Sequence, residues 1–255
     1  MNGFSILLRK ELLEAWRTRR LPVVAVLFLV VGIVSPLTAR YLPEIVKALG
    51  GQVQISIPPP VAADALAQLQ KNLGQLGALA AIALAMGSVS GELDRGTAAL
   101  VLAQPATRAA FLGAKLVAIG VVLGVSVIAA SFVAWIYTAI LFEPLPVAGW
   151  VAMAALSWLA LMAWASITFL ASAATGSTTA AAGIGFVGIV VISLASIVPT
   201  LDRLLPPALA APAIQLASAG VVADPGAALT AVLGTTALIV VAAVGAQLAF
   251  RSREL

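Results

Sequence analysis

The stretch AFLGAKLVAIGVVLGVSVIAASFVAWIYTAIL, residues 110–141, decides the fold of this chain. Its only charged side chain is Lys115, close to its beginning. A helix needs about 20 mostly apolar residues to cross a bilayer, and this stretch is longer than that. It also lacks the strict alternation of a membrane β-strand. The sequence therefore predicts a spanning helix here, tilted or emerging from the membrane at one end.

Five more segments have a similar length and composition: residues 21–39, 73–90, 150–172, 179–198 and 227–250. The whole chain is 62% hydrophobic and 9% charged, with a mean hydropathy of +1.11, whereas soluble domains carry about 25% charged residues. Helices satisfy every backbone group within the segment, as a membrane span requires. We expect an all-α integral membrane protein with six transmembrane helices over residues 21–250.

The distribution of Lys and Arg predicts the orientation. With six spans both termini lie on one side, which would carry Arg9, Lys10, Arg17, Arg19, Arg20, Arg95, Arg108, Lys115, Arg251 and Arg253. The other side would hold only Arg40, Lys47, Lys71 and Arg203. Basic residues are enriched in cytoplasmic loops. We therefore expect a multi-pass protein of the cytoplasmic (inner) membrane with both termini cytoplasmic, and no nucleic-acid partner for its positive charge.

Two long loops would then be external, residues 40–72 and 199–226. The prolines at 58–60 exclude helix at that point. Beyond them Leu66, Leu69, Leu73 and Leu76 share one helical face, which predicts a helix that rises into the second span. Prolines alternate with apolar residues in the second loop, which favours short or re-entrant helices.

Residues 1–20 predict a cytoplasmic amphipathic helix at the membrane interface. Its apolar face would consist of Phe4, Leu8, Leu12 and Trp16, in contact with membrane lipid. Lys10 and Glu14 would lie opposite, as an i,i+4 pair. The alternative is a simple basic anchor in front of the first span.

Several kinds of chemistry are excluded by what the sequence lacks. It contains no Cys and no His, which removes disulfides, thiolate sites and imidazole chemistry. It also contains no phosphate-binding loop, so ATP hydrolysis is not expected in this chain. The spans carry few ionisable groups at depth, which disfavours a proton-coupled carrier or an ion channel. We expect no metal, no cofactor and no catalytic residue in this chain.

Small residues in the spans predict close helix contacts. Gly120 and Gly124 form a GxxxG pattern, and Gly185 and Gly188 lie in a stretch rich in Ala and Gly. They would pack helices within the chain, or alternatively line an interface between subunits.

The connection GELDRGTAALVLAQPATRAAFLGAK, residues 91–115, is unusually polar for this chain. Gly96-Thr97 predicts a turn and an N-cap, followed by a short helix over 98–103. Pro105 would end that helix, and Thr107 and Arg108 would begin the third span. Lys115 would extend back to the interface. A short helix between charged ends, within the cytoplasmic loop 91–109, is typical of a docking element.

This pattern resembles the signature between the second and third spans of type-2 ABC exporter permeases. The matching residues are Glu92, Gly96, Thr97, Leu100, Leu102, Pro105, Arg108 and Lys115. The resemblance extends to the whole chain and implies a membrane subunit that binds a separate cytoplasmic ABC ATPase, where ATP and Mg would bind. It also implies a homodimer or a pair with a second permease. Carried over to this sequence, the ATPase-coupling residues are Glu92, Arg95, Gly96, Thr97, Pro105 and Arg108.

The residues alone leave other interpretations open. A local salt bridge at a solvated interface could account for Glu92, Asp94 and Arg95. Arg108 and Lys115 could be basic residues that only set the orientation of the chain in the membrane. At the level of function, the chain could be a noncatalytic membrane anchoring or assembly subunit for a cytosolic partner. An intramembrane enzyme that uses a serine or Lys115 is a further alternative, although no acid or base is paired with them at depth.

Overall fold

The computed structural model describes residues 3–49, 58–96 and 107–251, and this part of the chain is helical without strands. Six of its helices are long and apolar enough to cross a membrane: Arg20–Val46, Ala62–Asp94, Arg108–Leu141, Val147–Thr175, Thr178–Ala195 and Pro225–Arg251. The prediction of an all-α protein with six spanning helices is therefore confirmed.

The first span belongs to α2 (Arg20–Leu49), which follows α1 (Gly3–Arg17) after a sharp bend. The prediction ended this span at residue 39 and assigned residue 40 onward to an external loop. Instead the helix continues to Leu49, with Pro36 and Pro43 inside it. Prolines are tolerated where neighbouring helices support the backbone, and α2 packs along α7.

The second span is assembled from four pieces: α3 (Ala62–Asn72), the π-helix η1 (Leu73–Gly77), α4 (Ala78–Met86) and α5 (Ser90–Asp94). The predicted helix after the prolines is present, and Leu66, Leu69 and Leu73 are buried as expected. Leu76, however, is exposed, while Gly77 and Ala78 are buried. A π turn holds one extra residue, so the buried face moves one residue along the chain.

The remaining spans are α7 (Arg108–Leu141), α8 (Val147–Thr175), α9 (Thr178–Ala195) and α12 (Pro225–Arg251). Between α9 and α12 lie three short helices, α10 (Pro199–Asp202), η2 (Pro206–Leu209) and α11 (Ala210–Ala219). The predicted short helices are thus present, and α11 packs against α8 and α3. Re-entry of this segment into the membrane stays a prediction.

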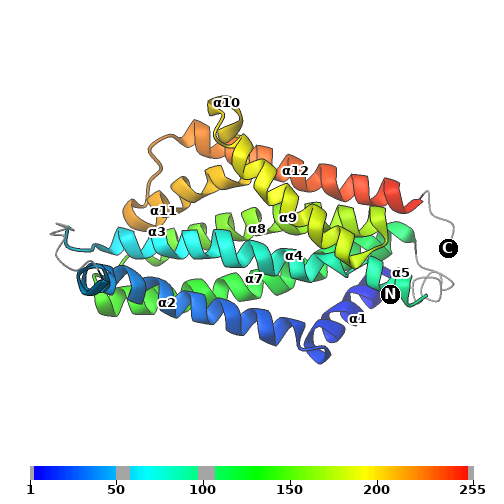
Figure 1. Ribbon diagram of the computed structural model, residues 1–255, viewed down its shortest axis with the longest axis horizontal. Coiled ribbons are helices and arrows are strands. Elements are labelled where there is room, and N and C mark those ends of the chain that lie inside the picture. The colour runs from blue at the N-terminus through cyan, green and yellow to red at the C-terminus, as the bar shows by residue number, and fades with distance from the viewer. Residues whose placement is uncertain (1–2, 50–57, 97–106, 252–255) are drawn as a thin grey trace.

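The spans run along the longest axis of the molecule, and both ends of the chain lie at the same end of the bundle (Figure 1). α1 and α5 lie at that end, whereas α11 and the beginning of α3 lie at the opposite end. The core is filled mainly by α4, α7 and α8, with Phe111, Leu123, Leu161 and Phe169 nearly inaccessible. α1 therefore lies beside the place where the second span ends and the third begins.

Candidate functional site

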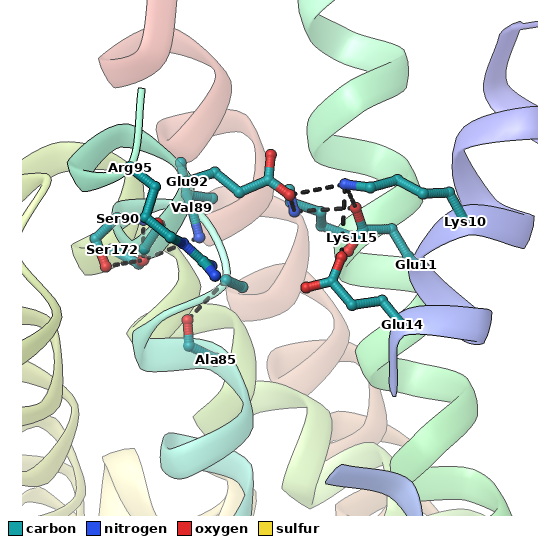
Figure 2. A network of polar contacts seen from close by, with 12 residues as sticks. Lys10, Glu11, Glu14, Ala85, Val89, Ser90, Glu92, Arg95, Lys115 and Ser172 are labelled. Atoms are coloured by element: carbon teal, nitrogen blue, oxygen red, sulfur yellow. Dashed lines mark hydrogen bonds and ion pairs between the residues drawn. The ribbon is translucent and has the colours of Figure 1, made fainter. Parts of the chain in front are cut away.

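A cluster of charged side chains joins three helices at the end of the bundle that holds the chain termini. Glu92 comes from α5, Lys115 from the second turn of α7, and Lys10, Glu11 and Glu14 come from α1. Figure 2 shows these side chains converging on one point. We call these five residues the charge cluster.

One carboxylate oxygen holds the charge cluster together. Oε1 of Glu92 accepts hydrogen bonds from Nζ of Lys10 and from Nζ of Lys115, each at 2.8 Å. Lys115 also donates to Oε1 of Glu11 at 3.0 Å, and Lys10 donates to the same Glu11 oxygen at 3.1 Å. Lys10 and Glu14 form the predicted i,i+4 ion pair, at 3.6 Å. The ammonium groups thus alternate with carboxylates, and the five residues come from three separate helices.

The centre of the cluster is shielded from solvent, and its edge is not. The side chains of Lys115 and Glu92 are 3% and 7% exposed, whereas that of Lys10 is 40% exposed. The ring of Phe111 covers Lys115, with Nζ 5.0 Å from the ring centroid. Buried ions persist only when partners replace their lost hydration. Glu92 and Lys115 therefore form a buried ion pair that links α5 to α7, and Lys10 is the more solvent-accessible partner of Glu92.

The surroundings of Lys10 favour the charged form of its side chain. Burial opposes the positive charge of Lys10, but the hydrogen bond to Glu92 and the charges of Glu11 and Glu92 outweigh it. The pKa of Lys10 is therefore raised above its ordinary value.

Oxygens of Glu11, Glu14 and Glu92 lie within 4.8 Å of one another, a spacing that a cation could bridge. The ammonium group of Lys10 already lies within 3.6 Å of an oxygen from each of these carboxylates. Lysine therefore supplies the counter-charge that a metal ion would otherwise provide.

A second polar group positions α5 so that Glu92 can enter the cluster. The second span breaks between Met86 and Ser90, which leaves backbone N–H groups without helical partners. Oγ of Ser172 in α8 accepts from the backbone N–H groups of Ser90, at 3.0 Å, and Val89, at 3.3 Å (Figure 2). Oγ of Ser90 in turn lies 2.9 Å from Oγ1 of Thr178 in α9. α8 and α9 therefore fix the break from which α5 departs.

The predicted coupling residues occupy different environments. Glu92 is buried in the charge cluster, whereas Arg95 is exposed and its Nε donates to the carbonyl of Gly91 at 2.7 Å. Gly96 has a φ of 67°, which supports the predicted turn. Thr97, Pro105 and the predicted helix over 98–103 lie outside the described residues.

Arg108 binds a different part of the molecule. Its Nη1 donates to the carbonyls of Phe250 and Arg251, at 3.2 and 2.9 Å, at the end of α12. The last carbonyls of a helix have no partner within the helix, so Arg108 ties the start of the third span to the end of the sixth.

The helix predicted at the N-terminus is present as α1, and its predicted apolar residues are exposed to different degrees. Phe4 and Trp16 are 37% and 63% exposed, Leu8 and Leu12 are partly buried, and Leu7 is the buried residue of this helix. Lys10 and Glu14, expected opposite the apolar face as an i,i+4 pair, bind each other as predicted, and Lys10 also binds Glu92. An interfacial position of α1 stays a prediction.

The four glycines predicted at helix contacts lie against residues of α8. A methyl group on Gly120 would come 3.3 Å from Sδ of Met162, and one on Gly124 would come 3.4 Å from Nε1 of Trp158. On Gly188 it would lie 3.2 Å from Ile167, and on Gly185 it would collide with Oγ1 of Thr168. These glycines therefore face contacts within the chain.

Sequence reasoning missed three participants in the site. No pattern in the sequence indicates a role for Glu11 or Ser172, and Lys115 is predicted to extend back to the interface. One signal was available for Lys115, because a lysine within a spanning segment is costly unless it has a partner.

Comparisons with known proteins agree with this architecture. The model of a family described as ABC-2 family transporter proteins matches residues 5–217. The uncharacterized transmembrane protein YxlG of Bacillus subtilis (strain 168) is 33% identical over 148 residues, which is 56% of this chain and 57% of that protein. The chain thus spans little more than half the length of this curated relative. With a family match that runs from α1 to α11, this multi-pass membrane protein belongs to the ABC-2 family of transporter proteins.

Proposed function

We propose that this chain is the permease subunit of an ATP-driven ABC exporter, with ATP bound and hydrolysed by a separate cytoplasmic subunit. ABC-2 permeases generally work with such an ATP-binding subunit and are normally noncatalytic. The observation that supports the proposal most strongly is the charge cluster, which connects α1, α5 and α7 beside the connection between the second and third spans.

The charge cluster would pass a movement of one helix on to the others, because its ion pairs hold α1, α5 and α7 together. The connection 97–106 joins Gly96, just after α5, to Thr107, the N-cap of α7. A partner that pushes on this connection moves two helices that Glu92 and Lys115 bind to each other at 2.8 Å. Lys10 adds α1 to the same unit. The Ser172 hydrogen bonds extend it to α8 and α9.

The transport step needs no covalent chemistry in this chain. Two permease subunits, identical or similar, would enclose the pathway, and ATP-driven motion would open it alternately to each side. Spans poor in charge favour an apolar or amphipathic substrate that enters from the cytoplasm or the inner leaflet. Both termini would then be cytoplasmic, in accordance with the concentration of Lys and Arg at their end of the bundle.

The test is purification of the tagged full chain from its native membrane in a mild detergent. We expect an ATPase subunit to copurify and its ATP turnover to respond to the permease after reconstitution in nanodiscs. Glu92→Gln should preserve copurification and reduce the stimulated turnover severalfold. Glu44→Gln, which alters an exposed carboxylate near the C-terminal end of α2, away from the charge cluster, is the matched control.

The outcomes separate this proposal from the anchoring alternative. If an ATPase copurifies with the wild type and its turnover is the same with Glu92→Gln and with Glu44→Gln, coupling would lie outside the charge cluster. Recovery of a cytosolic partner without a phosphate-binding loop, and of no ATPase, would contradict the exporter and support a membrane anchoring or assembly subunit.

A further inference from the structure

A cleft of about 640 Å³ opens between the bend that joins α1 to α2 and the end of the second span. Thr18, Arg19 and Arg20 contribute one side, and Gly91, Asp94 and Arg95 contribute the facing side. Deeper along the spans it is lined by Val23, Val24, Ala83, Leu84 and Met86. It lies apart from the charge cluster, none of whose five residues lines it.

The cleft is polar at one end and apolar at the other because its two sides run in opposite directions. α2 enters the membrane from Arg20 toward Val24, while the second span leaves it from Ala83 toward Arg95. The charged residues of both sides therefore meet at the level of the headgroups, and the aliphatic residues meet below them. A phospholipid has the same order of groups, a charged headgroup followed by hydrocarbon chains.

The charge balance at the polar end favours an anion. Three guanidinium groups, of Arg19, Arg20 and Arg95, face one carboxylate, of Asp94. In the described part of the chain none of the three arginines forms an ion pair. Guanidinium groups bind phosphate oxygens through paired hydrogen bonds, and basic pockets between spans on the cytoplasmic side bind acidic headgroups.

The backbone at Arg19 has an uncommon conformation. This residue has a φ of 60°, in the left-handed region where glycine is unstrained and most other residues are uncommon. The bend between α1 and α2 would form more easily with glycine. Arginine at this position adds a long cationic side chain to the lining of the cleft, at the expense of backbone strain.

We infer that this cleft is a binding site for one anionic phospholipid of the leaflet beside the chain termini, with its phosphate held by Arg19, Arg20 and Arg95. The parts of its acyl chains nearest the headgroup lie along Val23, Val24 and Leu84. A bound headgroup bridges the α1–α2 bend to α5 and so fixes the angle at which α1 meets the bundle. This inference goes beyond the proposed function, because it holds whether or not an ATPase binds.

The test compares lipids on the purified, delipidated full chain. Phosphatidylglycerol, phosphatidylethanolamine and inorganic phosphate are added separately, and bound lipid is counted by native mass spectrometry. We expect one phosphatidylglycerol to bind tightly, phosphatidylethanolamine to bind at least about tenfold more weakly, and inorganic phosphate not to compete at equal concentration. A basic residue near the membrane surface strengthens anionic lipid binding roughly fivefold. Replacement of all three arginines by Gln should therefore weaken it about a hundredfold.

Matched variants keep the test decisive. Lysine at the same three positions preserves the charge and should retain most of the affinity, while Arg9→Gln/Arg17→Gln/Arg40→Gln removes three charges outside the cleft and should change affinity less than about twofold. Arg19→Gly removes one cleft charge and also relieves the backbone, so it separates lost binding from lost folding. Equal phosphatidylglycerol affinity in the cleft and control variants overturns the inference. So does competition by inorganic phosphate, or equal binding of phosphatidylethanolamine.

Discussion

Lys10 and Lys115 donate to the same carboxylate oxygen, Oε1 of Glu92, each at 2.8 Å, from two different helices, α1 and α7. Two like charges this close would repel each other without the carboxylate between them. Glu92 therefore holds α1 and α7 together as well as binding each of them.

The first prediction concerns the loss of that central charge. Glu92→Gln leaves Lys115 nearly inaccessible, with Glu11 as its remaining acidic partner in the described part of the chain. Removing one member of a buried ion pair costs about 3–5 kcal/mol in proteins, so we expect a clear decrease in the thermal unfolding midpoint in detergent. Glu44→Gln should leave the midpoint unchanged. A midpoint that stays at the wild-type value in Glu92→Gln would show that the pair carries no net stability.

A double-mutant cycle should show that Glu92 and Lys115 act as a unit. Lys115→Met removes a buried cation. In the Glu92→Gln/Lys115→Met protein both charges of the ion pair are gone, so neither is left buried without the other. We expect the double variant to be less destabilised than the sum of the single variants by about 1–3 kcal/mol. Glu92→Gln combined with Glu44→Gln should be additive within about 0.5 kcal/mol. Additivity in both cycles would exclude the pairwise interaction.

Lys10 predicts the pH dependence of stability. Its folded-state pKa is raised above the ordinary value of 10.5, so its contribution is fully present below pH 10.5 and is lost as the pH rises through the folded-state pKa. The difference in unfolding midpoint between wild type and Lys10→Met should stay constant from pH 7 to about pH 10 and shrink above that. A difference that vanishes near neutral pH would mean that Lys10 is not held charged by its neighbours.

Ser172→Ala should loosen the break at the base of α5. It leaves the backbone N–H groups of Val89 and Ser90 without the oxygen that accepts from them at 3.3 and 3.0 Å. A buried donor that loses its acceptor costs about 1–3 kcal/mol. Ser126→Ala is the control, because Ser126 is equally inaccessible but, among the described residues, its hydroxyl bonds within its own helix, to the carbonyl of Val122. We expect faster amide exchange at residues 89–92 in Ser172→Ala alone, and equal exchange in both variants would contradict this role.

Gly32 tests the contact between the first and third spans. A methyl group at this position would collide with the carbonyl oxygen of Ala130 in α7, and backbone atoms cannot move aside as a side-chain end can. Gly32→Ala should therefore destabilise the protein by about 1–3 kcal/mol. Gly183→Ala meets no atom within 4 Å and should be neutral or slightly stabilising. Similar unfolding midpoints for the two variants would contradict close packing of α2 on α7.

The spans could be predicted from the sequence because they depend on composition over long windows. Five of the six predicted spans lie within one of the long helices, and the predicted span 179–198 runs slightly past the end of α9 at Ala195; most ends agree within a few residues. The exceptions are the second span, which begins at Ala62 and not at residue 73, and α2, whose continuation past residue 39 contains Arg40 and Glu44. Charged residues there indicated a loop, yet a helix that leaves the apolar layer can keep its backbone hydrogen bonds while carrying charge.

The charge cluster could be predicted only in part, because a helical pattern shows which residues share a face and not what that face meets. The periodicity of α1 places Lys10 and Glu14 together, but the partner of that face is decided by residues 82 and more positions away. Lys115 was assigned to the interface because side chains near helix ends often extend there. The Glu92 carboxylate within reach offered a nearer partner.

The π turn at Leu73–Gly77 has a consequence for insertions and deletions. Such a turn carries one residue more than the α-helix around it, and no atom lies within 4 Å of the position a methyl group on Gly74 would take. Deletion of Gly74 would restore regular α-helical bonding and leave both flanking faces seated on their neighbours. The same deletion elsewhere in this span would rotate one half by about 100°, turning Leu66 and Leu69 away from the core. The second span can thus change its length by one residue at this turn without repacking the bundle.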